Sequence, residues 1–236
     1  MSFLKAEWRK LVMINYEVNP KILEKYLPVG TELDFFQNKC YASVVGFMFK
    51  NTKLLGVKIP FHINFEEVNL RFYVKRKTKE GYKRGVVFIK EIVPKSAITF
   101  VANTFYNENY ETLPMIHSWE DKEGSLKVTY QWKKNKKWNY IKVEAENSLN
   151  KIEENSVIEF ISEHYWGYAK EDDKSTTEYE VKHSKWEYYK INTYTVSIDF
   201  ESNYGSDFSF LNDEKPTSVM LLEGSEISVE NKKSIK

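Results

Sequence analysis

The chain has 236 residues, a formal net charge of +1 and a single cysteine, Cys40. This balance lacks the basic excess typical of nucleic-acid-binding proteins, so no nucleic-acid partner is expected. One cysteine cannot form an internal disulfide, which fits a reducing compartment. Abundant Tyr, Phe and Trp favour β-structure. The length is typical of one large domain, and we expect a single domain over residues 1–236 with a frayed tail from residue 230 onward.

The N-terminal segment is interrupted by charged residues at Lys5, Glu7, Arg9 and Lys10. A secretory signal peptide needs an uninterrupted apolar core, and no later stretch is long and apolar enough to span a membrane. The sequence therefore predicts a cytoplasmic protein without a membrane partner.

The first quarter of the chain predicts a strand, a short helix and a hairpin. Residues 8–18 form the strand, and Asn19 caps a helix that has Pro20 at its first position. The hairpin arms are 32–36 and 40–49. Residues 51–61 form a loop rich in apolar side chains, which is either a lid over a cavity or a satellite packing cluster.

The middle of the chain contains the clearest strand patterns. Apolar and polar residues alternate along 67–76 and again along 86–92, with a turn between them. Pro94 ends the second strand, and Ser96 is the expected N-cap of a helix over 97–106. Its buried stripe is expected to comprise Ile98, Val101, Ala102 and Phe105.

The second half continues with hairpins and one further helix. The basic run 133–138 is expected to be the solvated tip of a hairpin, and the helix is expected to start at Asn155-Ser156. Residues 195–200 fit either a strand or a short helix. The expected strands are 110–117, 127–132, 138–145, 177–182, 186–191, 218–222 and 226–229, the last two forming a hairpin around Gly224.

Strands outnumber helices, and hairpin connections are frequent. The predicted fold class is therefore α+β but mainly β: a single antiparallel β-barrel or strongly curved sandwich with two or three flanking helices.

Several kinds of site have no sequence signal. The chain contains no Gly-rich phosphate loop, no HExxH element and no paired cysteines. The four histidines lie far apart in sequence, and lone histidines are usually structural, so no metal and no cofactor are predicted.

Polar residues follow one face of the strand 67–76, namely Glu67, Asn69 and Arg71, and Lys90 lies on the neighbouring strand. Charged groups inside a barrel must pair or bind something. This face is therefore a ligand-binding wall, a solvated outer face or a structural Glu–Arg network.

Lys95 follows Pro94 at a strand-to-helix corner. The positive end of a helix dipole disfavours an ammonium group, and a lysine so affected can act as a Schiff-base nucleophile. The alternative is a surface lysine at a turn. A second polar and aromatic cluster contains His164 and Trp166, which either pack together or contact a ligand.

The runs FEEVNLRFYV, VVFIKEIVPKSAITFVAN, YNENY and EHYWGY, with LPVGTELDFF and VKHSKW, resemble the YqjF-like family of uncharacterised bacterial proteins. The resemblance covers nearly the whole chain and implies a fold like that of acetoacetate decarboxylase, a β-barrel with flanking helices.

The same resemblance assigns roles to two residues. Acetoacetate decarboxylases carry a Pro-Lys-Lys element whose first lysine forms a Schiff base, and Lys95 matches that position, but Ser96 replaces the second lysine. Glu67 in Phe65-Glu66-Glu67-Val68 matches their active-site glutamate. Loss of the neighbouring lysine removes a main cause of a lowered lysine pKa.

Three hypotheses follow. In the first, the barrel binds a small organic ligand. If this ligand is acidic, Arg71 or Lys95 supplies the counter-charge. In the second, Lys95 forms a Schiff base with a small keto acid or aldehyde, and Glu67 orients it or shuttles protons. In the third, the chain is a structural or partner-binding domain, with a homo-oligomer left open.

Overall fold

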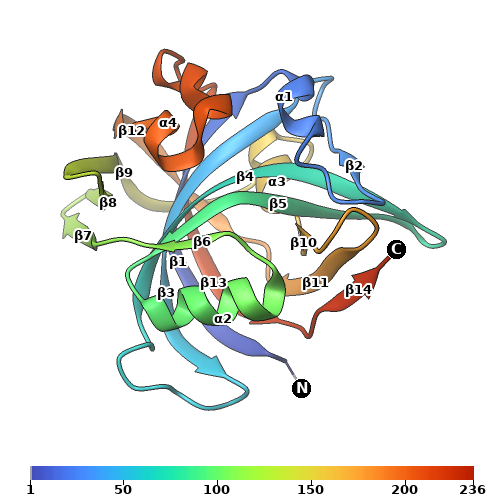
Figure 1. Cartoon of the computed structure of the whole chain (residues 1–236). Coiled ribbons are helices and arrows are strands. Elements are labelled where there is room, and N and C mark those ends of the chain that lie inside the picture. The colour runs from blue at the N-terminus through green and yellow to red at the C-terminus, as the bar shows by residue number, and fades with distance from the viewer. Residues whose placement is uncertain (1) are drawn as a thin grey trace.

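The computed structural model describes residues 2–236, and almost all of its strands belong to one strongly curved sheet. Figure 1 shows this sheet wrapping around the molecule with helices at its margins. The strands are β1 (Leu4–Glu17), β2 (Glu32–Leu33), β3 (Tyr41–Leu54), β4 (Phe65–Thr78), β5 (Gly81–Val93), β6 (Tyr110–Thr112), β7 (Met115–Lys122), β8 (Ser125–Lys134), β9 (Lys137–Lys151), β10 (Trp166–Lys170), β11 (Thr176–His183), β12 (Glu187–Ser197), β13 (Ser218–Val229) and β14 (Lys233–Ile235). The helices are α1 (Pro20–Glu24), α2 (Ser96–Tyr106), α3 (Val157–Ser162), α4 (Phe200–Tyr204) and a 3₁₀ helix over Ser206–Asn212.

Part of the sheet closes into a ring. The strands follow the order β11, β10, β5, β4, β3, β1 and β13, and β13 pairs again with β11 through Val181 and Val229. Most neighbours are antiparallel, but β10 and β6 each pair with β5 in parallel. The predicted mainly β, strongly curved architecture is therefore confirmed, with these parallel pairs as exceptions to its antiparallel pattern.

The two faces of β4 enter two different cores, as its alternating sequence predicts. Val68, Leu70 and Phe72 point outward into a core between the ring and a second layer. Tyr73 points inward, into the core that the ring encloses. The polar residues between the apolar ones therefore face the interior.

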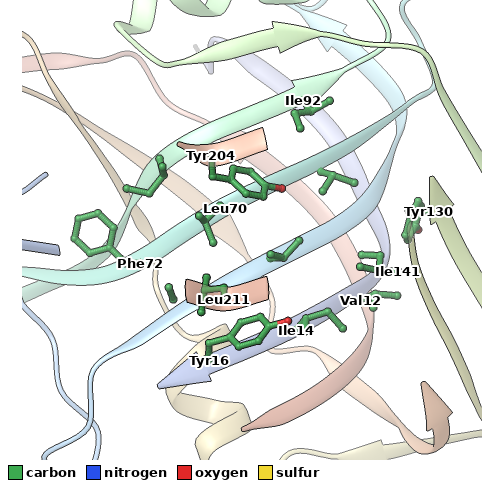
Figure 2. Packing of buried hydrophobic residues seen from close by; sticks show 14 of the residues in the cluster. Val12, Ile14, Tyr16, Leu70, Phe72, Ile92, Tyr130, Ile141, Tyr204 and Leu211 are labelled. Atoms are coloured by element: carbon green, nitrogen blue, oxygen red, sulfur yellow. The ribbon is translucent and has the colours of Figure 1, made fainter. Parts of the chain in front are cut away.

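The outer core lies between the ring and the layer made by β7, β8, β9 and α4. Figure 2 shows side chains of the ring, including Leu70 and Phe72, packed near Tyr130, Ile141 and Tyr204. Of its buried polar groups, the indole N–H of Trp132 donates to Asn203 at 2.8 Å, whereas the hydroxyl of Tyr204 has no partner in the described part of the chain. This layer therefore closes the apolar outer face of the ring.

Two of the three predicted helix N-caps are confirmed, and one is wrong. Asn19 accepts a hydrogen bond from the backbone of Lys21, and Ser156 caps α3 by accepting from Glu159, both as predicted. The predicted cap Ser96 is wrong, because Lys95 occupies that position and makes no side-chain cap bond. Phe105 is also not on the buried stripe of α2; it is exposed, and Tyr106 is buried instead.

Two predicted hairpins do not form. Residues 32–36 contribute only β2, which pairs with β4 rather than with β3. Residues 218–229 form one continuous strand along β1 instead of a hairpin. Gly224 has φ +83, and a Cβ there would lie 2.0 Å from the carbonyl oxygen of Trp8, so this glycine permits close strand contact rather than a turn.

Strand pairing and the element bounds decide the remaining predictions about the basic run, residues 195–200 and the C-terminal tail. The basic run forms the tip of the β8–β9 hairpin, with Lys134 opposite Lys137. Residues 195–200 contain both alternatives, because β12 ends at Ser197 and α4 begins at Phe200. The tail expected to be frayed adds β14 to the edge of β11. No helix within residues 2–236 is long and apolar enough to cross a membrane.

Candidate functional site

A cavity of about 220 Å³ lies inside the ring, between the inner faces of the strands and α2. Most of its wall is aromatic or aliphatic. Its aromatic members include Trp8, Phe47, Phe49, Phe65, Phe88 and Trp186. Ala97, Ile98, Val101 and Ala102 of α2 complete one side. In Figure 1, α2 crosses in front of the strands.

The structure brings five of the sequence-predicted site residues to this cavity: Glu67, Asn69, Arg71, His164 and Trp166. The first three come from the inner face of β4, and the other two come from the segment that follows α3. The inner-wall alternative for the polar face of β4 is thus the observed one. Lys90 and Lys95 do not line the cavity.

Lys90 is turned away by a β-bulge. Arg71 pairs with Phe88 while Leu70 pairs with Lys90, so one residue of β5 is unmatched between them. An extra residue reverses which side chains face inward beyond it. Lys90 therefore lies outside and bonds Glu111 at 3.2 Å, and Glu91 takes the inward position.

Lys95 lies at the start of α2, where its backbone carbonyl accepts from Ile98 and Thr99. Its side chain is half-buried, outside the cavity wall. Within residues 2–236, no lysine lines the cavity. An amine that is to form a Schiff base must reach the bound carbonyl, and this arrangement does not provide that contact.

Three carboxyl groups gather at one end of the cavity: Glu67, Glu91 and Glu108. The hydroxyl of Tyr110 donates to Glu67 at 3.1 Å, and the hydroxyl of Tyr179 donates to Glu108 at 2.7 Å. Asn69 donates its amide N–H to the other oxygen of Glu67 at 3.0 Å. One oxygen of Glu91 has no partner.

Burial raises the pKa of each of these carboxyls. Desolvation raises the pKa of Glu67 to about 7, against the lowering effect of Asn69 and Tyr110. Desolvation and repulsion from Glu67 raise the pKa of Glu108 to about 8. The pKa of Glu91 is raised well above its usual range by desolvation and by the other two carboxyls. The cluster is therefore largely protonated near neutral pH, and protonated carboxyls can donate hydrogen bonds.

A glycine keeps Tyr179 in contact with this cluster. A Cβ at Gly167 would lie 2.1 Å from the ring of Tyr179, far inside van der Waals contact. Only glycine at this position of β10 leaves room for the ring, whose hydroxyl reaches Glu108. The backbone of β10 therefore shapes the acidic end of the cavity.

Arg71 supplies positive charge in the wall. Its side chain is buried, and its guanidinium donates a long hydrogen bond, 3.4 Å, to the carbonyl of Ile161. Its Nε has no partner, and it forms no salt bridge within residues 2–236. A buried guanidinium without a paired carboxylate is costly unless something else satisfies it.

His164 also presents an unpaired atom. Its Nε2 lies 3.2 Å from Asp34, while its Nδ1 is buried without a partner. Desolvation lowers the pKa of His164 to about 4, so the ring is neutral at physiological pH. Unpaired buried polar atoms thus surround the cavity, and in proteins such atoms normally have partners.

The apolar loop between β3 and β4 contributes to the wall. The expected loop 51–61 is shorter than predicted, because β3 extends through Leu54. Ile59 and His62 line the cavity together with Leu54, while Val57 and Phe61 are exposed. The loop is therefore more than a distant satellite cluster. Its role as a lid stays a prediction.

Sequence reasoning missed four site residues: Glu91, Glu108, Tyr110 and Tyr179. Alternation along β5 placed Glu91 on the wrong face, because the bulge carries no sequence mark. Glu108 and Tyr110 looked like the end of a helix and the start of a strand. The run Tyr-Asn-Glu-Asn-Tyr around Glu108 is dense in polar and aromatic residues, and that density was the available signal.

No group of three His, Cys, Asp or Glu side chains in the described part of the chain is arranged to hold a metal ion. The polar groups present are those that recognise organic oxygen and nitrogen atoms: a guanidinium, protonated carboxyls, phenols, an amide and an imidazole.

The fold is similar to that of solved acetoacetate decarboxylase-like proteins. Acetoacetate decarboxylase from Legionella pneumophila matches with a TM-score of 0.68 at 11% identity, covering 99% of this chain and 87% of that one. The enduracididine biosynthesis enzyme MppR, solved with pyruvate, matches with a TM-score of 0.69 at 11% identity, covering 100% and 91%. An acetoacetate decarboxylase-like enzyme from Sphingomonas wittichii RW1 matches with a TM-score of 0.62 at 10% identity, covering 100% and 94%.

These TM-scores show a shared fold, which is the one that the sequence resemblance implied. A comparison with curated proteins finds no significant match in sequence. The family model of DUF2071, described as an uncharacterized conserved protein, matches residues 5–226. The chain therefore belongs to the DUF2071 family and has an acetoacetate decarboxylase-like fold.

Proposed function

We propose that the protein binds a small organic acid in the cavity inside the ring, with the carboxylate of the ligand on Arg71. The observation that carries this proposal is the unpaired Nε of Arg71, a buried guanidinium at the wall of an otherwise apolar cavity. Guanidinium and carboxylate groups form short, charge-assisted hydrogen bonds, and a bound carboxylate would supply the missing partner.

The rest of the wall indicates the body of the ligand. Aromatic side chains such as Phe47, Phe65 and Trp186 favour an aliphatic or aromatic chain over a sugar or a nucleotide. The volume of about 220 Å³ suits a small molecule, since drug-sized ligands occupy cavities of about 300–1,000 Å³.

The carboxyl cluster is compatible with an anionic ligand because of its protonation. Three ionised carboxylates would repel a negatively charged molecule. The raised pKa values of Glu67, Glu91 and Glu108 keep much of this charge neutralised near pH 7. A neutral carboxyl such as that of Glu91 can instead donate a hydrogen bond to a ligand oxygen.

A solved neighbour supports the same ligand class. The enzyme MppR, which shares the fold, has been solved with pyruvate, a small organic acid. The low identity limits this support to the fold, so the proposal depends on the residues of this chain.

Schiff-base chemistry at Lys95 is the second hypothesis, and we rank it lower. It requires the amine of Lys95 to reach a carbonyl in the cavity, whereas Lys95 lies outside the cavity wall. Ligand binding requires no such rearrangement.

Calorimetric titration with a series of arylalkanoic acids tests the proposal. We expect 3-phenylpropanoate to bind to the wild-type protein, and Arg71→Met to weaken binding about 10- to 100-fold, because charged hydrogen bonds contribute ~1.5–3 kcal/mol. Arg76→Met is the matched control, since Arg76 lies on the same strand but pairs with Glu178 outside the cavity.

If Arg71→Met and Arg76→Met weaken acid binding equally, Arg71 does not bind the carboxylate of the ligand. If no acid in the series binds to the wild-type protein, the proposal is wrong, and the structural or partner-binding hypothesis gains.

A further inference from the structure

His164 is held by groups that lie behind the cavity wall. Its Nε2 is 3.2 Å from Oδ2 of Asp34, and Nε of Arg84 is 2.6 Å from the same oxygen. Burial alone would raise the pKa of Asp34, but the hydrogen bonds from His164 and Arg84 outweigh it and lower that pKa. Asp34 is therefore an ionised carboxylate that only accepts hydrogen bonds.

This arrangement determines the tautomer of His164. Because Asp34 can only accept, the hydrogen of the neutral ring lies on Nε2. The opposite nitrogen, Nδ1, then carries a lone pair and acts as an acceptor. It is fully buried, has no partner and belongs to a side chain that lines the cavity.

Arg71 and His164 lie in the same part of the cavity. Both pack on the ring of Tyr73: the guanidinium carbon of Arg71 is 5.6 Å from its centre, and the ring of His164 is 4.8 Å from it. Nε of Arg71 is a donor without a partner, and Nδ1 of His164 is an acceptor without a partner. A ligand that satisfies both must carry an anionic acceptor and a hydrogen-bond donor close together.

We propose that the cavity is selective for hydroxy carboxylic acids with an apolar tail: Arg71 binds the carboxylate, and Nδ1 of His164 accepts a hydrogen bond from the hydroxyl group. This inference rests on the proposed function and adds the substituent that the ligand carries. Asp34 and Arg84 act as positioning residues that keep Nδ1 free of a hydrogen. A keto acid lacks the donor and leaves Nδ1 unsatisfied.

Matched ligands test this selectivity on the unmodified protein. Calorimetric titration would compare 3-phenylpropanoate with 2-hydroxy-3-phenylpropanoate, 3-hydroxy-3-phenylpropanoate and 2-oxo-3-phenylpropanoate. We expect at least one hydroxy acid to bind about 5- to 30-fold more tightly than the parent acid, as a hydrogen bond to a buried unpaired acceptor contributes ~1–2 kcal/mol. The keto acid is expected to show no such gain.

A pair of variants assigns the gain to its acceptor. His164→Leu removes both ring nitrogens while Asp34 keeps Arg84 as its partner, so the hydroxyl preference is expected to disappear. His183→Leu is the matched control: His183 also lines the cavity, but its Nδ1 already has the carbonyl of Ser184 at 2.8 Å. There the preference is expected to remain. Thermal unfolding of both variants would verify that they fold.

The outcomes separate the two proposals. If all acids bind equally well, the further inference is overturned and the proposed function stands. If no acid binds, both are overturned. A hydroxyl preference that persists in a folded His164→Leu variant would show that His164 is not the acceptor.

Discussion

The inner and outer faces of the ring are built from the same strands but bury different kinds of group. The outer face of β4 presents Leu70 and Phe72 to a core of apolar side chains that contains no charged group within residues 2–236, although the hydroxyl of Tyr204 there has no partner. The inner face of the same strand presents Glu67, Asn69 and Arg71, and Oδ1 of Asn69 and Nε of Arg71 have no partner in that range. Proteins rarely leave buried polar atoms unsatisfied without a functional reason. This difference is the one expected if the outer face provides stability and the inner face binds a ligand, as we propose.

The largest expected effect tests the outer face. Phe72→Ala removes a fully buried ring from the core between the two layers. We expect the free energy of unfolding to fall by about 3–5 kcal/mol, because the substitution loses buried apolar surface and leaves a cavity. Urea unfolding monitored by tryptophan fluorescence would measure this. A loss below about 1 kcal/mol would mean that the outer layer contributes little to stability.

On the inner face, in contrast, replacing the buried residue Glu67 is expected to raise the free energy of unfolding. Glu67 has a pKa of about 7 in the folded protein, raised by desolvation from 4.5. The unfolded chain therefore loses the proton first as the pH rises, and folding stability falls between about pH 4.5 and 7. Replacing Glu67 by Gln removes this cost, which is on the order of 3 kcal/mol above pH 7, since one pKa unit corresponds to ~1.4 kcal/mol.

The difference between wild type and Glu67→Gln reports this effect together with the repulsion by which Glu67 raises the pKa of Glu91 and of Glu108. His164, whose pKa is lowered to about 4, contributes a change of opposite sign below pH 6.5, but it does so in both proteins. Unfolding in urea at intervals from pH 4.5 to 8 would therefore show Glu67→Gln gaining stability relative to wild type as the pH rises. A constant difference across this range would show that Glu67 titrates normally.

A smaller effect is expected where the backbone shapes the inner face. Gly167→Ala forces the ring of Tyr179 away from its place beside Glu108. We expect destabilisation of about 1–3 kcal/mol, typical of overpacking, together with weaker binding of the arylalkanoic acids. Tyr179→Phe is the control, since it removes the hydroxyl and keeps the ring. If Gly167→Ala lowers stability and acid binding less than Tyr179→Phe does, the close contact between Gly167 and the ring of Tyr179 is not important.

The contrast between the two faces also explains what the sequence could predict. Alternation along residues 67–76 correctly separated Leu70 and Phe72 from Glu67, Asn69 and Arg71, because a regular strand has a period of two. It failed at Lys90 and Glu91, because a bulge reverses that alternation and depends on pairing with a distant strand. The hairpin expected at 218–229 failed for a related reason: Gly224 is set by its contact with β1, which is remote in sequence.

The cavity itself required long-range information as well. Glu108 and Tyr179 are 71 positions apart, and His164 and Asp34 are 130 apart. No local pattern reports such contacts. The family resemblance correctly implied the overall fold, but the lysine that it pointed to lies outside the cavity wall.

The smallest expected effect concerns that lysine. Lys95 makes no hydrogen bond through its side chain as the cap of α2 and does not line the cavity, so Lys95→Met is expected to leave acid binding and stability within about 0.5 kcal/mol of wild type. Borohydride reduction in the presence of small keto acids, followed by peptide mass spectrometry, is expected to yield no adduct selective for Lys95. A selective adduct that is absent in Lys95→Met would reverse our ranking, because it would require Lys95 to reach a bound carbonyl. It would also mean that α2 moves its first turn toward the cavity, and the inner face would then have to be regarded as a site for covalent chemistry rather than for binding alone.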